Sequence, residues 1–229
     1  CEALAASTME RYRRNRRWGA DAVHVALVLL ARIDTGRGEE TLADVASVDL
    51  GGYSATYAGM ASWALLEIGQ PELARAALGP EGSVADLPDD WLWLAGMGLA
   101  GLAVAGLGDR AAAAILYERL APYPGMMALA GTNSTLCSVD HVLGRLSDTL
   151  GELDAARDHL SAAIEIEDRL GAVAWSSRAR IARASVLRRL GGPAELDAAA
   201  ADLAEVRSVA TRLGLLRVLD HVEEAERAH

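Results

Sequence analysis

The chain has 229 residues, 52% hydrophobic and 24% charged, a composition typical of a globular protein with a sizeable core and not of a disordered chain. Its 22 basic residues are all arginine, which excludes a lysine Schiff base and the lysine of a phosphate-binding loop. A net charge of -10 would repel a phosphate backbone, so direct nucleic-acid binding is not expected.

The cysteine content points to a reducing compartment. Cys1 and Cys137 are too few for a disulfide framework or a cysteine-rich metal cluster, so we expect a cytoplasmic protein. We also expect no cofactor and no membrane association. Because the first residue is Cys1 and not methionine, we also expect a piece of a longer polypeptide. A lipidated terminal cysteine is the alternative, although stable anchoring would need a second signal.

Apolar residues recur at helical spacing through most of the chain, and short breaks that contain glycine separate the segments. In the segment 153–170, for example, Leu153, Leu160 and Ile164 lie on one stripe. No segment alternates as a strand would, and the connection 121–134 is expected to be an irregular loop. In chain order, the predicted helices cover 21–34 and 39–49, 53–68 and 71–78, 90–107 and 109–121, 134–150 and 153–170, 173–190 and 195–213, and 215–227.

Two sequence markers recur with a period of 43 residues. Leu-Gly-Asp at 107–109 corresponds to Leu-Gly-Glu at 150–152, and Arg-Leu-Gly at 169–171 recurs at 212–214. A glycine just after the last apolar position of a helix typically adopts a left-handed conformation. Each helix pair has an apolar face that it cannot bury alone. We therefore expect an all-α fold, a right-handed superhelix of stacked antiparallel helix pairs that forms one domain over 1–229.

Within 140–164, Gly144 lies midway along the first helix, Gly151 lies at the turn, and Leu160 occupies a large apolar position on the second helix. This pattern resembles the tetratricopeptide repeat, which pairs two helices in each unit. The 43-residue period is longer than that family's usual period of roughly 34 residues, and Asp168 stands where a terminating proline is typical.

Further short sequence segments, spread over nearly the whole chain, resemble a second and more specific family. They lie at 16–18, 87–91, 107–109, 117–123, 150–153, 169–172 with Trp175, and 188–192. Together they resemble the C-terminal helical-repeat region of large bacterial ATP-binding regulators, including LuxR-type activators and cyclase-linked predicted ATPases. The resemblance implies a non-catalytic module of a signalling or transcriptional regulator. Such a module would bind a partner and transmit the bound state to other domains of the same polypeptide, among them an ATPase domain.

The first helices of stacked pairs are expected to line a concave surface. The 43-residue phase places Arg145 and Arg188 at equivalent points of this surface, beside His141, and we expect Trp63 on the same side. These four residues are the candidate interaction site for a protein, a peptide or a small effector. One alternative is that this surface is only a solvated groove. Another is that the chain is a structural module that associates with a second copy as a homodimer.

The most compact group of chemically reactive side chains is Cys137, Asp140 and His141. On a helix, the i,i+4 spacing would place Cys137 and His141 on one face, within reach of a metal ion or of each other as a thiolate–imidazole pair. A metal site needs more ligands, and no HExxH, GxSxG or paired-cysteine motif accompanies them. We therefore expect no catalytic, cofactor-binding or metal-binding residues, with a helical enzyme or metal-binding protein as the alternative.

The glycines at 96, 98 and 101 match the spacing of a dinucleotide-binding fingerprint, and Glu118 lies at a suitable distance to meet a ribose. That fingerprint requires a preceding strand, whereas these glycines lie inside one long apolar segment, so we expect close helix packing instead. The uncharged run at 91–107 would reach only about 26 Å as a helix. A buried helix is therefore expected and not a membrane span.

Overall fold

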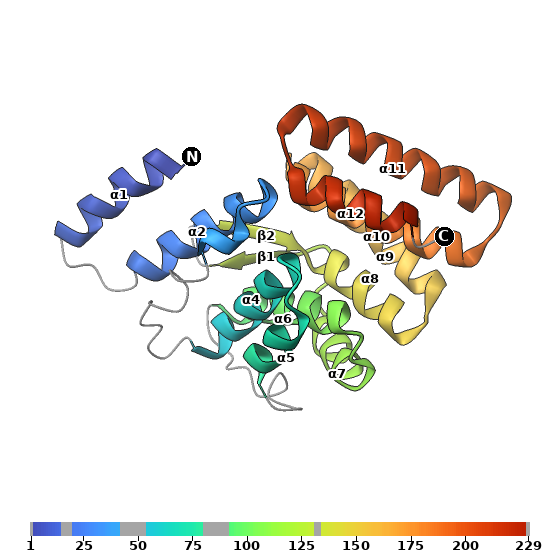
Figure 1. Ribbon diagram of the computed structural model, residues 1–229. Coiled ribbons are helices and arrows are strands. Elements are labelled where there is room, and N and C mark those ends of the chain that lie inside the picture. The colour runs from blue at the N-terminus through green and yellow to red at the C-terminus, as the bar shows by residue number, and fades with distance from the viewer. Residues whose placement is uncertain (1, 15–19, 42–53, 80–91, 131–133, 228–229) are drawn as a thin grey trace.

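The computed structural model describes residues 2–14, 20–41, 54–79, 92–130 and 134–227. Within these ranges the chain forms eleven α-helices, one short 3-10 helix and one two-stranded antiparallel sheet (Figure 1). Helices that follow one another in sequence pack against one another, and each pair also contacts the next pair. The predominantly helical fold expected from the sequence is confirmed, with the small sheet as an addition.

The first part of the chain contains seven helical elements. They are α1 (Glu2–Arg14), α2 (Ala20–Asp34), η1 (Gly38–Thr41), α4 (Ser54–Glu67), α5 (Pro71–Leu78), α6 (Trp93–Leu107) and α7 (Arg110–Leu120). Where a predicted helix end falls on a described residue in this part of the chain, it lies within one residue of the observed end of α2, α4, α5, α6 or α7. The segment 39–49 begins in a 3-10 turn and not an α-helix, and 42–49 lies outside the described residues. Helix α1 was not predicted.

The second part begins with the strands β1 (Met127–Ala130) and β2 (Ser134–Ser138) and continues as five helices. These are α8 (Val139–Leu150), α9 (Leu153–Arg169), α10 (Val173–Leu190), α11 (Pro193–Leu213) and α12 (Leu216–Arg227). The marker glycines have the predicted left-handed conformation, with φ of +66° at Gly171 and +69° at Gly214. Their positive φ ends each helix and directs the chain into the next one.

The segment 121–138 differs from the prediction, because it contains a β-hairpin. Strands β1 and β2 pair through Leu129 with Thr135 and through Met127 with Ser138. The predicted helix start at 134 was therefore wrong. Helix α8 begins at Val139 because the Ser138 side chain caps it, its Oγ accepting the His141 N–H at 3.2 Å.

Helix α6 lies at the centre of the main core, and residues 95–104 are buried on all sides. A Cβ at Gly98 would lie 3.3 Å from the Ala128 Cβ, and a Cβ at Gly101 would overlap the Val142 side chain. The interpretation of these glycines as close packing positions is confirmed, since neighbouring side chains fill the space beside them. No described helix is both long enough and apolar enough to span a membrane.

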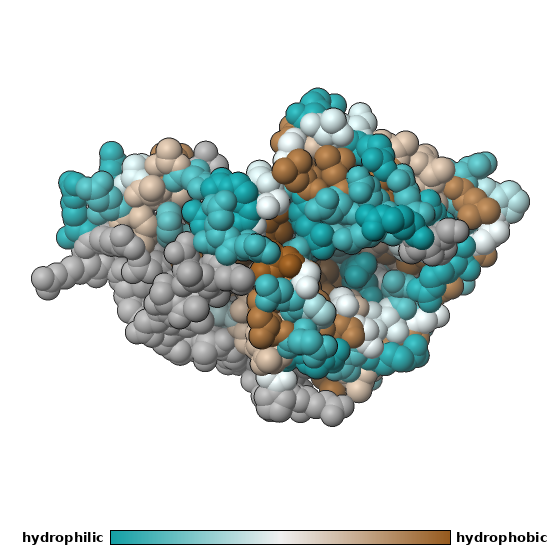
Figure 2. Space-filling model, in the orientation of Figure 1, coloured by the Kyte–Doolittle hydropathy of each residue, from teal (hydrophilic) through white to brown (hydrophobic). Residues whose placement is uncertain are grey.

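The C-terminal helix α12 packs against α11 and α10 and also reaches α2, near the other end of the chain. Its first residue, Leu216, lies against the turn that follows α2, where a Cβ at Gly36 would be 3.3 Å from the Leu216 Cβ. Figure 2 shows polar residues over α11 and α12 and an apolar patch at the turn between them, where Leu213 and Leu216 are about half exposed. Helix α12 thus bridges the two parts of the chain.

Candidate functional site

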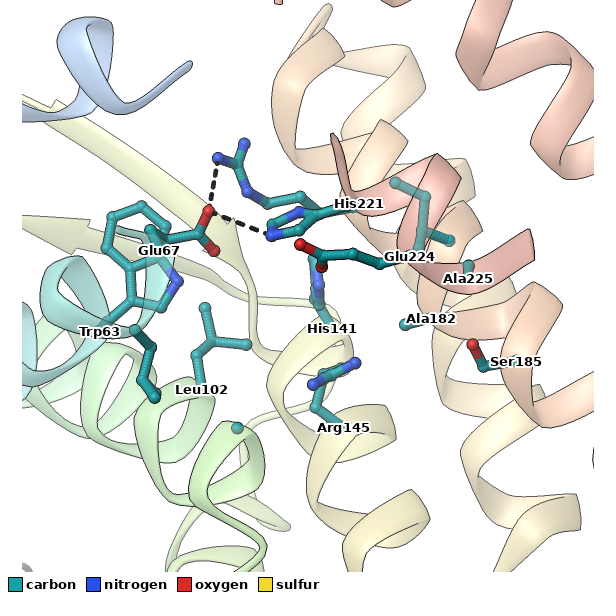
Figure 3. A pocket seen from close by; sticks show the side chains of 14 residues that line it. Trp63, Glu67, Leu102, His141, Arg145, Ala182, Ser185, His221, Glu224 and Ala225 are labelled. Atoms are coloured by element: carbon teal, nitrogen blue, oxygen red, sulfur yellow. Dashed lines mark hydrogen bonds and ion pairs between the residues drawn. The ribbon is translucent and has the colours of Figure 1, made fainter. Parts of the chain in front are cut away.

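A pocket of about 440 Å³ lies between α4, α6, α8, α10 and α12 (Figure 3). Every residue that lines it comes from α12 or from the first helix of a pair, and the second helices α5, α7, α9 and α11 contribute none of the lining residues. This is the side on which the sequence placed a candidate interaction surface. The volume falls in the range of roughly 300–1,000 Å³ that is usual for small-molecule sites.

One wall of the pocket contains a buried arginine that lies against two tryptophans in contact with each other. The Trp63 and Trp175 rings lie 5.4 Å apart, and Arg178 Cζ lies 5.7 Å and 5.4 Å from their centroids. Arg178 Nη2 also lies 2.7 Å from Asp34 Oδ1 and 3.4 Å from Glu67 Oε2. Burial lowers the pKa of Arg178, but the Glu67 and Asp34 carboxylates outweigh it and leave the pKa raised. Arg178 is therefore a permanently charged structural residue.

The Glu67 carboxylate also holds α12. Its Oε2 atom lies 3.6 Å from Arg217 Nε and 3.6 Å from His221 Nε2, and the contact with His221 is drawn in Figure 3. Because this carboxylate is shared with two guanidiniums, it does not keep His221 protonated. Burial, followed by the charges of Arg217 and Arg178, lowers the pKa of His221 to about 3. His221 is thus neutral near pH 7.

Arg145 is the pocket residue whose charge is not matched by a neighbouring carboxylate. Its guanidinium points into the space between Leu102 on one side and Ser185 on the other (Figure 3). Among the residues that the structure describes, none forms an ion pair or a hydrogen bond with this side chain. By contrast, Glu224, at the rim, is paired with Arg217, whose Nη1 lies 3.2 Å from Glu224 Oε1.

His141 lines the pocket from α8, where the sequence placed it. Its side chain is buried, and residues outside the pocket hold it. Its Nδ1 lies 3.2 Å from Glu167 Oε1 of α9, and its ring meets Trp175 edge-on at 6.1 Å. The same Glu167 oxygen accepts the Ser138 N–H at 2.8 Å. This buried network therefore fixes the orientation of the His141 ring.

The four residues of the predicted concave face are placed as follows. Trp63, His141 and Arg145 all line the pocket. Arg188 does not, because its Nη1 donates a hydrogen bond of 2.7 Å to the backbone oxygen of Ala225 on α12. Arg188 thus supports a neighbouring helix, and the other three residues form the part of the predicted site that the fold brings together.

The alternative cluster of Cys137, Asp140 and His141 does not form. Cys137 lies in β2 and not on a helix face with His141, so the predicted i,i+4 arrangement was wrong. Burial, and then the Glu167 charge, raise the pKa of the Cys137 thiol well above its ordinary value. Asp140 accepts the Gly125 N–H at 2.6 Å and lies 3.1 Å from His159, away from the His141–Glu167 pair.

Within the described ranges, no three His, Cys, Asp or Glu side chains are arranged to hold a metal ion. Burial raises the pKa of Asp140, but hydrogen bonds from His159 and Gly125 outweigh it, so the pKa is lowered and the carboxylate stays charged. Asp140 therefore stabilises the turn before β1 and the start of α8.

Sequence reasoning missed the charged residues that join the two halves of the pocket, Glu67, Arg178, Arg217 and His221. A signal for one of them was present. Arg178 lies three residues after Trp175 and four before Ala182, on a face that is otherwise apolar. A charge at such a position needs a buried partner. The partner itself, Glu67, is 111 residues away, and no local pattern identifies it.

Comparison with known proteins identified no relative: no family model, no curated protein and no solved structure matches this chain. The proposal of a binding site therefore depends on the chemistry of the pocket.

Proposed function

We propose that this chain is a non-catalytic helical-repeat module that binds a small effector or a short peptide in the pocket between its inner helices. The observation that carries the proposal is that this one pocket is walled by α4 and α6 from the first half of the chain and by α10 and α12 from the second. A bound ligand would contact both halves at once. Its binding free energy would then favour one arrangement of α12 over others.

The repeat itself is proposed to be tetratricopeptide-like, wound as a right-handed superhelix. The support is the sequential packing of antiparallel pairs and the glycine-terminated helices at 43-residue spacing. We also propose that the module belongs to a cytoplasmic signalling or transcriptional regulator with an ATP-binding domain elsewhere in the polypeptide. This part rests on the resemblance of the short sequence segments to the helical-repeat region of bacterial ATP-binding regulators.

Binding is favoured over catalysis by the state of the reactive groups. The Cys137 thiol is buried, with a raised pKa, and the His141 ring is held by Glu167. His221 is neutral and lies in the contact between α12 and α4. His141 and His221 line the pocket and Cys137 lies in the core, so the arrangement offers a recognition surface more than an activated nucleophile.

A screen by thermal unfolding tests the proposal. Small molecules and short peptides are added to the whole chain and to Ser185→Leu, which narrows the pocket from α10. The matched control is Ser208→Leu on the exposed face of α11. We expect compounds that raise the midpoint temperature of the wild type and of Ser208→Leu but not of Ser185→Leu.

Two results would contradict this function. If every stabilising compound acts equally on Ser185→Leu, binding takes place outside the pocket. If mass spectrometry shows that a bound compound is converted to a product, and Ser185→Leu stops the conversion, the site is catalytic.

A further inference from the structure

The charges around the pocket are almost completely matched in pairs. Glu67 faces Arg178 and Arg217, Glu224 faces Arg217, and Asp34 faces Arg178. Arg145 is different, because no side chain in the described part of the chain pairs with it, although it is partly buried and points into the cavity. A partly buried cation without a counter-charge favours binding of an anion.

The shape and the surroundings of Arg145 narrow the class of anion. A guanidinium presents two parallel N–H donors, which match the two oxygens of a carboxylate or a phosphate. Glu67 and Glu224 line the same pocket, so a phosphate with two negative charges would be repelled more strongly than a singly charged carboxylate. The balance of charge therefore favours a monoanion.

Leu102, Ile181 and Ala182 form an apolar part of the lining, and Ser185 adds one hydroxyl group. A ligand that buries apolar surface against these side chains gains affinity without a second charge.

From these observations we propose that the pocket binds a small organic monocarboxylic acid, whose carboxylate pairs with Arg145 and whose apolar body packs against Leu102, Ile181 and Ala182. This inference rests on the proposed binding function and names the ligand class of the same site.

Three probes with one common body test the inference. 2-Naphthoate, 2-naphthamide and 2-naphthyl phosphate are titrated calorimetrically into the whole chain. A charge-assisted hydrogen-bonded pair strengthens binding by roughly ten- to a hundredfold, so we expect the acid to bind at least about tenfold more tightly than the amide. The phosphate is expected to bind more weakly than the acid.

Two variants test whether Arg145 causes the preference for the acid over the amide. Arg145→Gln removes the charge, and Arg212→Gln removes an exposed arginine from the outer helix α11 and leaves the pocket intact. We expect Arg145→Gln to lose the preference for the acid over the amide and Arg212→Gln to keep it. The amide also reports on folding, because its affinity is expected to stay unchanged in both variants.

Several results would overturn the inference. If the acid and the amide bind equally, or if the preference survives in Arg145→Gln, the carboxylate is not recognised by this residue, while the pocket itself remains a ligand site. Tighter binding of the phosphate would reassign the ligand class. If none of the three probes binds at millimolar concentration, the inference fails, and the Ser185→Leu comparison still decides the proposed function separately.

Discussion

The two halves of the chain contribute charges of opposite sign to the ion pairs beside the pocket. Helices α2 and α4 provide the carboxylates Asp34 and Glu67, whereas α10 and α12 provide the guanidiniums of Arg178 and Arg217 that pair with them. The two halves of the chain therefore meet through charges of opposite sign, close to the cavity. A ligand in the cavity would lie next to the contacts between Glu67 and α12.

The two halves also differ in how their helices approach one another. In the first half, glycines on α4 and α6 bring backbones together around one large apolar core. In the second half, smaller apolar clusters are accompanied by arginine–carboxylate pairs, such as Arg183 with Asp202 and Arg180 with Asp168. Close packing at glycine continues into the second half at Gly144, which lies against Leu160, and the second half adds polar contacts between its helices.

The largest effect is expected from Glu67→Gln, which removes the carboxylate that joins the two halves. Arg178 would keep only Asp34, and Arg217 would lose its contact with α4. Breaking a buried ion pair by removing one partner costs about 3 kcal/mol of unfolding free energy or more. Urea unfolding followed by circular dichroism measures the loss, with Glu118→Gln on the exposed face of α7 as the control. Equal stability of both variants would show that charge does not hold the halves together.

A smaller loss is expected from Gly59→Ala, which tests the close packing of the first half. The added Cβ would lie 2.8 Å from the backbone nitrogen of Ala100, which has little freedom to move. Overpacking of this kind costs about 2 kcal/mol. In the matched variant, Gly106→Ala, the Cβ would meet only the flexible end of Leu66 at 2.9 Å, which can move aside. Both variants gain the same helix propensity of about 1 kcal/mol, so the difference in stability between them reports the contact with the Ala100 backbone. Equal losses in urea unfolding would contradict this difference.

Most helix boundaries could be predicted because they depend on local signals. A left-handed glycine ends α6, α8, α10 and α11, and proline begins α5 and α11. The β-hairpin could not be predicted in this way, since its strands are only four and five residues long and depend on pairing with each other. The serine cap at Ser138 was present in the sequence, and it would have placed the start of α8 correctly.

The pocket could be predicted only in part. Arg145 follows from the 43-residue phase, with His141 beside it, and Trp63 was expected on the same side. Glu67 and His221, in contrast, come together through packing of segments more than 150 residues apart. Arg188 occupies the same phase as Arg145, yet it is not in the pocket because α12 covers it. A repeat period predicts which face a residue lies on, but it does not predict what a non-repeating terminal helix covers.

The unfolding free energy is expected to depend on pH because of His221. The pKa of this residue is about 3 in the folded chain, and its ordinary value is 6.5. Below pH 6.5 the unfolded chain binds a proton that the folded chain does not, so stability falls as the pH decreases toward 3. The unfolding free energy should decrease by about 1.4 kcal/mol between about pH 7.5 and about pH 5.5. The charges that face this ring are Glu67 from α4, Arg145 from α8, Arg178 from α10, and Arg217 and Glu224 from α12 itself.

His221→Gln separates this effect from the titration of other groups. The variant should lose less stability than the wild type over the same pH interval, by about 1.4 kcal/mol. Parallel pH profiles of the two proteins would show that His221 is protonated in the folded chain and that its pKa is not lowered by burial.

The smallest effect is expected from Arg188→Gln. Its guanidinium donates to the Ala225 oxygen in the last turn of α12, where the backbone carbonyls have no intrahelical donor. Loss of this hydrogen bond should cost about 1 kcal/mol, and hydrogen exchange should quicken in α12 more than in α11. Because Arg188 lies behind the pocket wall, the acid-over-amide preference should persist, unlike in Arg145→Gln. Loss of that preference in Arg188→Gln would mean that recognition depends on the position of α12 and not on the Arg145 charge alone.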